Sequence, residues 1–229
     1  MSHVAAVLLA GASGLVGRHV LARLLARTDG PRVLAPVRIE LATRSPRLVT
    51  VVCDLAPAGD AELTERLRRE SPTIDAYVCC LGSTLRKAGS REAFLAVDRD
   101  LVLRMAAIAH GMGARQAIVV SSVGASAQSG NFYLRIKGET ERALAEMGFD
   151  RVDLLRPGLL LGDRDESRPG EAFARALTPF TNPLLRGPLR RYRGIAASDV
   201  AAAAVALLGR DEPGRNAHEN TELVALAAT

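Results

Sequence analysis

The chain has 229 residues, of which 48% are hydrophobic and only 3% aromatic, and it has no tryptophan. A chain of this length can bury a core of alanine, leucine and valine in one domain without disulfides. The formal net charge of +5 comes from arginines spread along the sequence and not from one basic run, which argues against a nucleic-acid-binding protein.

The cysteines and the N-terminus predict the compartment. Two of the three cysteines are adjacent, at Cys79 and Cys80, so they give neither a disulfide framework nor a paired metal-binding spacing. The four histidines show no ligand spacing either, and we expect no metal. No stretch approaches about 20 uncharged apolar residues, so we expect no membrane span. We also expect no signal peptide, because the first apolar run is the predicted strand itself. A reducing cytoplasm is the expected location.

Strand and helix patterns alternate along most of the chain. In chain order, the patterns predict a strand at 4–10, a helix at 16–26, strands at 33–37 and 48–52, a helix at 60–69, a strand at 76–80, a helix at 91–112, a strand at 117–120, a helix at 131–147 and a strand at 152–155. Such alternation with short connections predicts a Rossmann-like α/β fold, a doubly wound parallel sheet with helices on both faces.

The alternation breaks after Pro157. We expect a short helix at 171–177, an alanine-rich helix at 198–208 and a final strand at 222–226. The part after residue 158 is too small for its own core. The sequence therefore predicts one NAD(P)-binding domain over residues 1–229, with residues 158–195 as a small cap on the substrate side.

A glycine-rich turn, Gly11-x-x-Gly14-x-x-Gly17, joins the first strand to the first helix. Residues without a Cβ let the backbone approach an anion, and the helix behind them offers free N–H groups and the positive end of its dipole. This context predicts a bound dinucleotide, although the spacing differs from G-x-G-x-x-G and such glycines can simply permit a turn. The predicted cofactor-binding residues here are Gly11, Ser13, Gly14, Leu15, Val16, Gly17 and Arg18.

Ligands of parallel sheets bind beyond the carboxyl ends of the strands. Arg38 follows the second strand, where a cation suits the 2′-phosphate of NADP(H), with Arg18 as a second candidate. A solvated arginine is the alternative, and Glu40 would instead serve NAD(H). Asp54 follows the third strand and would accept a hydrogen bond from the adenine amino group or cap a turn. The predicted cofactor-binding residues at strand ends are Arg38, Asp54, Leu81, Gly82 and Pro157.

Tyr133 and Lys137 are four residues apart on a predicted helix and therefore share one face. An ammonium beside a phenol favours the phenolate, so Tyr133 could exchange a proton with a substrate oxygen. Ser122 ends the fifth strand, where its hydroxyl could hold that oxygen. We predict Ser122, Tyr133 and Lys137 as the catalytic residues, although a tyrosine and a lysine at this spacing are common without function.

Together these motifs resemble the short-chain dehydrogenase/reductase superfamily. The resemblance rests on the glycine turn, Ser121-Ser122-Val123-Gly124, Tyr133-x-x-x-Lys137 and Leu155-Arg156-Pro157-Gly158. The glycine spacing is similar to that of its extended and atypical branches. The stretch 80–89, with Phe94, Val97-Asp98 and Asn131-Phe132-Tyr133, resembles the atypical subgroup that contains the human Tat-interacting protein and bacterial relatives.

The resemblance implies a Rossmann-like fold that binds NADP(H). It also implies that Tyr133 donates or accepts the proton, that Lys137 holds the nicotinamide ribose and that Ser122 orients the substrate. One position departs from the pattern, because Asp98 stands where many members carry an asparagine that takes part in a proton relay.

We therefore expect an NADP(H)-dependent oxidoreductase that acts on a carbonyl or alcohol substrate. A second hypothesis is a regulatory protein that senses NADPH and binds a protein partner with little turnover. A sugar-nucleotide epimerase is a weaker third hypothesis, because the region after the sixth strand is small for such a substrate. The sequence determines neither the substrate nor the oligomeric state.

Overall fold

One parallel sheet forms the centre of the molecule. The computed structural model describes residues 2–162 and 187–229. The sheet has seven strands in the order β3-β2-β1-β4-β5-β6-β9, and all neighbours are parallel. The strands are β1 (Ala6–Ala10), β2 (Arg32–Val37), β3 (Leu48–Val52), β4 (Ala76–Cys79), β5 (Gln116–Val120), β6 (Arg151–Arg156) and β9 (Gly214–Glu219). The predicted Rossmann-like, doubly wound fold is confirmed.

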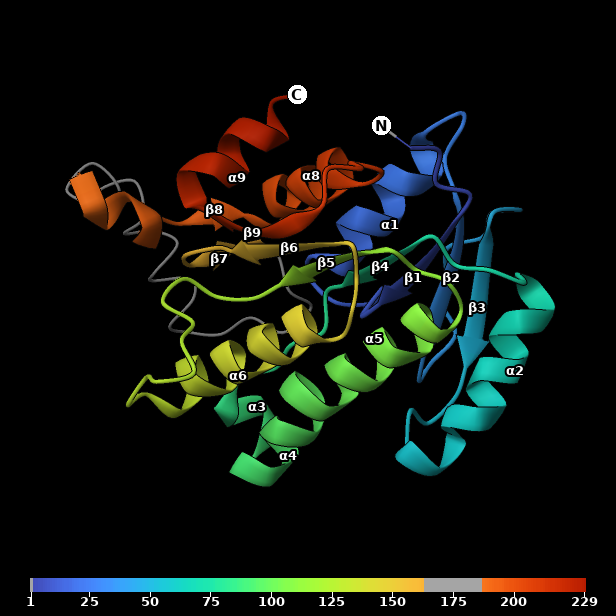
Figure 1. The fold of residues 1–229 in the computed structure, drawn as a ribbon, viewed down its shortest axis with the longest axis horizontal. Coiled ribbons are helices and arrows are strands. Elements are labelled where there is room, and N and C mark those ends of the chain that lie inside the picture. The colour runs from blue at the N-terminus through green and yellow to red at the C-terminus, as the bar shows by residue number, and fades with distance from the viewer. Residues whose placement is uncertain (1, 163–186) are drawn as a thin grey trace.

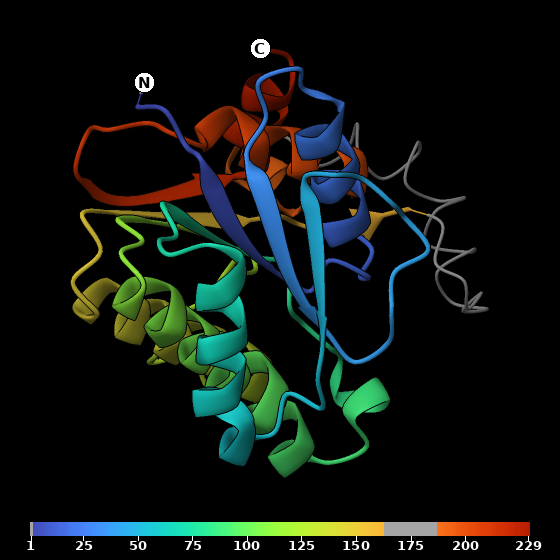
Figure 2. The same ribbon diagram turned by 90° about the vertical axis from the view of Figure 1, so that its right-hand side faces the viewer.

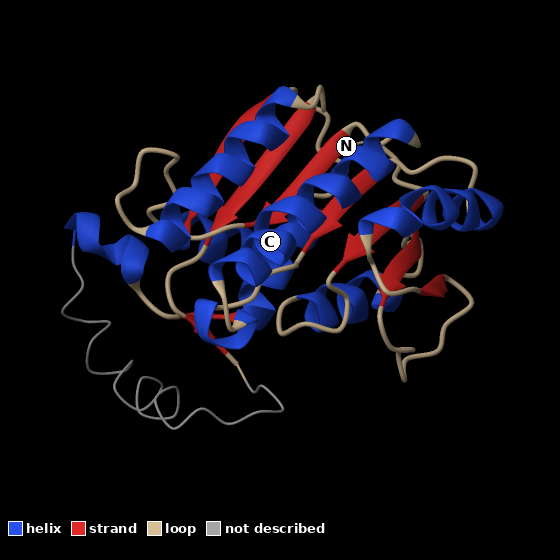
Figure 3. Cartoon of the chain, turned by 90° about the horizontal axis from the view of Figure 1, so that it is seen from below, coloured by secondary structure: helices blue, strands red, loops and turns tan. Residues whose placement is uncertain are grey.

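Helices cover both faces of the sheet, which lies between two helical layers in Figures 1 and 2. Seen from below in Figure 3, helices lie along the strands that they cover. The layer above the sheet in Figure 1 contains α1 (Gly17–Ala26), α8 (Ala197–Leu207) and α9 (Asn220–Ala227). The layer below contains α2 (Asp60–Glu70), α5 (Val102–Gly111) and α6 (Phe132–Glu146).

Each helical layer packs on its own hydrophobic core. In β1, Val7 and Leu9 belong to the core under α1 and α8, whereas Leu8 belongs to the core under α2 and α5. All five residues of β1 are buried, because successive side chains enter opposite cores. This two-sided burial explains why the strand is an unbroken apolar run.

The long helix predicted at 91–112 is divided in the structure. It consists of α4 (Arg91–Leu95), a π-helical stretch (Ala96–Leu101) and α5, and a further short helix, α3 (Leu85–Ala88), precedes it. π-Helical insertions are rare and frequently lie at functional sites. Here the insertion contains Asp98, a fully buried carboxylate.

The final strand predicted at 222–226 is wrong, because these residues belong to α9. Leu223 and Leu226, three residues apart, place their side chains in the core beside α8. The last strand is instead β9, whose sequence GRNAHE shows no apolar alternation. It lies at the sheet edge, where its buried His218 contacts Asp153 with Nε2 at 2.9 Å and Glu222 with Nδ1 at 2.7 Å.

Most of the predicted cap over residues 158–195 lies outside the described residues, as does the predicted helix at 171–177. Its two described ends meet, because β7 (Leu160–Leu161) pairs in parallel with β8 (Ile195–Ala196). Two short 3-10 helices complete the described elements, η1 (Pro57–Gly59) and η3 (Gly187–Tyr192).

Candidate active site

The glycine turn brings three backbone segments into close contact. Gly11 has φ +80° and lies against the end of β4, so a Cβ there would stand 2.7 Å from the carbonyl carbon of Cys80. A Cβ on Gly17 would stand 2.0 Å from the carbonyl oxygen of Gly11. The turn therefore requires glycine at both positions on steric grounds.

The N-terminus of α1 has no side-chain cap among the described residues. Val16 is its N-cap residue, and neither a capping side chain nor an acidic residue occupies the first turn. The backbone N–H groups of such a turn need acceptors, and the positive end of the helix dipole favours an anion. Both features suit an anionic group such as a phosphate.

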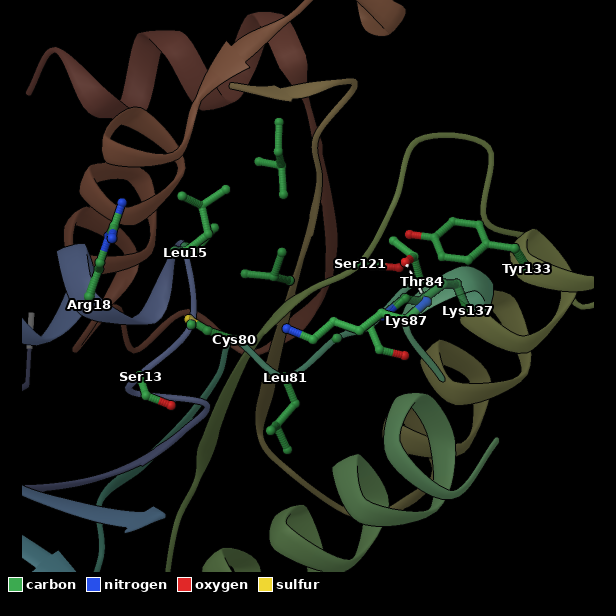
Figure 4. A pocket seen from close by; sticks show the side chains of 16 residues that line it. Ser13, Leu15, Arg18, Cys80, Leu81, Thr84, Lys87, Ser121, Tyr133 and Lys137 are labelled. Atoms are coloured by element: carbon green, nitrogen blue, oxygen red, sulfur yellow. Dashed lines mark hydrogen bonds between the residues drawn. The ribbon is translucent and has the colours of Figure 1, made fainter. Parts of the chain in front are cut away.

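A cleft of about 380 Å³ opens between this turn and α6, at the carboxyl ends of β1, β4 and β5. Figure 4 shows Ser13 and Arg18 on one side of the cleft and Thr84, Lys87, Ser121 and Tyr133 on the other. The predicted residues that line it are Ser13, Gly14, Leu15, Val16, Arg18, Leu81, Gly82, Tyr133 and Lys137. The other lining residues were not predicted as site residues, and they are Cys80, Ser83, Thr84, Lys87, Val120, Ser121 and Leu160.

Tyr133 is held by aromatic packing at the first turn of α6. Its ring lies 5.7 Å from that of the fully buried Phe94, measured between centroids. Asn131 caps the helix by accepting a hydrogen bond from the backbone N–H of Leu134 at 3.2 Å. Figure 4 shows the hydroxyl end of Tyr133 directed toward the cleft. Cap and ring contact together fix where the phenol lies.

Lys137 forms a buried ion pair. Its Nζ lies 2.8 Å from Oδ1 of Asp98, and the two side chains are 7% and 0% exposed. Burial by itself lowers the pKa of Lys137, but the Asp98 carboxylate and then Tyr133 raise it, and the balance lies above its ordinary value. Lys137 therefore carries its charge at neutral pH, and Asp98 compensates that charge.

Asp98 is held by Ser83 as well as by Lys137. Its Oδ2 accepts hydrogen bonds from the backbone N–H and the hydroxyl of Ser83, both at 2.8 Å. A Cβ on Gly82 would stand 3.5 Å from Oδ1 of Asp98 and 3.6 Å from Nζ of Lys137, so the glycine lies directly against the ion pair. The departure from asparagine noted in the sequence is thus a specific charged contact to the predicted catalytic lysine.

The two serines after β5 differ in position. Ser121 lines the cleft, and within the described residues its buried hydroxyl has no hydrogen-bond partner. The hydroxyl of Ser122 donates to the carbonyl oxygen of Val123 at 3.3 Å, and Ser122 is not among the lining residues. The structure therefore brings Ser121, and not the predicted Ser122, to the cleft beside Tyr133 and Lys137.

The remaining predicted residues frame the cleft or lie outside it. Gly11 and Gly17 shape the turn, and the carbonyl of Pro157 accepts a hydrogen bond from the N–H of Val123 at 3.0 Å. Asp54 accepts one from the N–H of Ala56 at 2.8 Å, which is the turn-capping alternative. It also lines a second hollow of about 390 Å³ beside α2.

Arg38 is exposed at the carboxyl end of β2. Glu40, the candidate for holding an NAD ribose, forms an ion pair with Arg44 at 2.8 Å. Arg18, the second candidate for a 2′-phosphate, lines the cleft beside the glycine turn. In the described region, Arg38 and Arg18 are thus the cations at the predicted phosphate position, and the carboxylate of Glu40 already has a cationic partner.

Cys80 lines the cleft, and burial raises the pKa of its thiol well above the ordinary value, so it is a neutral side chain. No group of three or more His, Cys, Asp or Glu side chains in residues 2–162 and 187–229 could hold a metal ion.

Comparison with known proteins matches most of the chain. A family model described as NAD(P)H-binding matches residues 11–211. The protein named "Protein fmp52, mitochondrial" from Emericella nidulans is 36% identical over 176 residues, which are 75% of this chain and 74% of that protein. Protein HTATIP2 from Rattus norvegicus is 38% identical over 172 residues, which are 74% of this chain and 68% of that protein. These matches confirm the resemblance to atypical short-chain dehydrogenases.

Solved structures share the fold at low identity. MoeE5 in complex with UDP-glucose and NAD has a TM-score of 0.66 and 20% identity, and the match covers 97% of this chain and 80% of that chain. At this identity the likeness establishes the fold alone.

The expected cytoplasmic location is wrong by these comparisons, because several of the relatives are named as mitochondrial proteins. Among the helices of the described residues, none combines the length and the hydropathy that a bilayer span requires.

Proposed function

Because this chain belongs to the NAD(P)H-binding family, we propose that it is an NADP(H)-dependent oxidoreductase of the short-chain dehydrogenase type. Its substrate is a carbonyl compound or the corresponding alcohol. One observation carries the proposal, which is that Tyr133 and Lys137 line the same cleft as the glycine turn of α1.

The glycine turn supports the coenzyme site. A Cβ at Gly17 would strike the carbonyl of Gly11, so the turn keeps this conformation only with glycine at that position. Gly14, Leu15 and Val16 would offer the pyrophosphate their backbone at the positive end of α1. When bound, the nicotinamide coenzyme supplies or accepts the hydride.

Tyr133 and Lys137 handle the proton. When a carbonyl carbon gains a hydride, the oxygen gains negative charge, and the hydroxyl of Tyr133 gives it a proton to form the alcohol. The tyrosinate left behind lies near the ammonium of Lys137, whose charge opposes the cost of ionising the phenol. In the oxidative direction Tyr133 takes the proton from the alcohol.

A comparison of the wild type with Tyr133→Phe tests the enzymatic function. We expect the wild type to oxidise NADPH with members of a carbonyl panel, and Tyr133→Phe to lose at least about 100-fold in kcat, in the range of general acid catalysis. The matched control is Tyr192→Phe, because Tyr192 is exposed and does not line the cleft. Equal turnover by the wild type and Tyr133→Phe would remove the phenol from the mechanism.

The preference for NADP(H) over NAD(H) rests on charge. Arg38 and Arg18 are cations near the expected position of the ribose, while Glu40 is paired with Arg44. We expect Arg38→Ala to weaken NADPH binding by about 10- to 100-fold and NADH binding by less than about twofold. Arg23→Ala, an exposed arginine within α1, serves as the control. Equal losses for the two coenzymes would refute the assignment.

A second candidate function follows from Asp98. Its carboxylate compensates the charge of Lys137, which reduces the positive potential available to the phenol of Tyr133. A protein that binds NADPH and then a protein partner, with little turnover, needs no such potential. This alternative predicts that NADPH raises the melting temperature while no member of the carbonyl panel is reduced.

A further inference from the structure

The cleft has a cation on its Tyr133 side that the coenzyme chemistry does not use. Three cationic side chains line the cleft, namely Arg18, Lys87 and Lys137, and none of the described lining residues is acidic. Arg18 lies on the α1 side, where phosphates are expected, and Lys137 is paired with Asp98. Lys87 lies opposite Arg18, with Thr84 and Tyr133.

The backbone fixes the position of Lys87. It belongs to the one-turn helix α3, where Thr84 is the N-cap and its Oγ1 accepts a hydrogen bond from the N–H of Lys87 at 3.2 Å. The helix ends at Gly89, which adopts φ +82° and donates its N–H to the carbonyl of Leu85 at 3.0 Å. Two defined ends on so short a helix hold the Cβ of Lys87 toward the cleft.

Lys87 and Lys137 differ in their charge partners within the described residues. None of the residues in 2–162 and 187–229 forms an ion pair with Lys87, whereas the ammonium of Lys137 already has the carboxylate of Asp98 at 2.8 Å. An ammonium beside a partly enclosed cleft attracts an anion more strongly than one in open solvent.

We infer that Lys87 is a specificity residue that binds an anionic group, a carboxylate or a phosphate, on the carbonyl substrate. The inference rests on the proposed function, since it places the reacting carbonyl at Tyr133. The substrate anion would lie on the Lys87 side of the phenol and the carbonyl on the coenzyme side. The substrate class is therefore a 2-oxo acid or a phosphorylated aldehyde or ketone.

Paired probes test the inference on the full chain saturated with NADPH. Benzoylformate is compared with its neutral methyl ester, and glyceraldehyde 3-phosphate with glyceraldehyde, so the two pairs distinguish a carboxylate from a phosphate. We expect the wild type to favour at least one anion by about 10- to 100-fold in kcat/KM. Lys87→Ala should abolish that preference and change the neutral probes by less than about threefold, and Lys87→Arg should keep it.

The matched control is Arg86→Ala, which removes a neighbouring exposed cation that does not line the cleft. We expect it to leave the preference unchanged. The preference of the wild type should also fall as salt is raised, because screening weakens a partly exposed charge pair. Calorimetric binding of the same probes to the NADPH complex gives the ratio where turnover is slow.

Two results would overturn the inference. One is a wild type that treats each anion and its neutral partner alike, and the other is a Lys87→Ala variant that keeps the preference. A Lys87→Ala variant that weakens NADPH binding while keeping the ratio would assign Lys87 to the coenzyme instead. If the wild type does not bind NADPH at all, the proposed function fails and the inference fails with it, so the two failures are distinguishable.

Discussion

Replacing Asp98 by asparagine leaves a buried ammonium without its counter-ion. Asp98 is fully buried, Lys137 is nearly so, and their charged atoms lie 2.8 Å apart. Breaking such a pair from one side costs about 3–5 kcal/mol of unfolding free energy. For a chain of this size that corresponds to a fall in melting temperature of about 6–20 °C.

The penalty has an upper limit, because Lys137 can release its proton in the folded state. Releasing a proton at pH 7 from a lysine whose ordinary pKa is 10.5 costs about 5 kcal/mol. Without Asp98, burial lowers the pKa of Lys137, so the folded variant binds fewer protons than the unfolded chain. Its stability therefore rises with pH until the ordinary pKa is reached. In the wild type the raised pKa of Lys137 gives the opposite sign, since its stabilisation is lost as pH rises through that value.

The assay is thermal and urea unfolding of the wild type, Asp98→Asn, Lys137→Met and the double variant between pH 6 and 10. We expect a gap of about 3–5 kcal/mol between the wild type and Asp98→Asn at pH 7 that narrows toward pH 10. The double variant should be more stable than Asp98→Asn, because it no longer contains the unpaired charge. A gap below about 1 kcal/mol at pH 7, or one that does not change with pH, would refute this reasoning.

Two further predictions concern the glycine turn and the sheet edge. Gly17→Ala should lower the melting temperature and abolish the shift caused by NADPH, because its Cβ would stand 2.0 Å from the carbonyl oxygen of Gly11. The control Gly111→Ala, with nothing within 4 Å of its Cβ, should keep the wild-type melting temperature and the NADPH shift. A normal NADPH shift in Gly17→Ala would contradict the steric argument. Burial lowers the pKa of His218, but its two carboxylate partners raise it above 6.5, so its stabilisation is complete below that value and is lost as pH rises through the raised pKa. The melting temperature of His218→Gln should lose this pH dependence, while His3→Gln, at an exposed site, should keep it.

The strands of the sheet differ in whether a local sequence pattern predicts them. Apolar runs located six of the seven strands of the sheet, because strands between two helical layers bury most of their side chains. They missed β9, whose GRNAHE sequence is polar because the strand lies at the edge and buries His218 against the carboxylate of Asp153. No local pattern marks a strand whose buried residue is satisfied by a side chain 65 positions away.

The glycine turn and the Tyr133–Lys137 pair could be read from the sequence, because each is a contact between neighbours along the chain. A strand, a turn and a helix N-terminus follow one another directly, and residues four apart share a helix face by geometry. The folded chain alone decides that the two motifs line one cleft, since that requires β1, β4 and β5 to be adjacent in the sheet.

The choice between Ser121 and Ser122, the compensation of Lys137 by Asp98 and the approach of Lys87 to the cleft were likewise decided by tertiary structure. The first depends on which side of the chain faces the cleft after β5, and the second on a π-helical insertion that turns Asp98 toward α6. Sequence spacing carries no information on such contacts, because they join segments whose relative position is set by packing across the whole sheet.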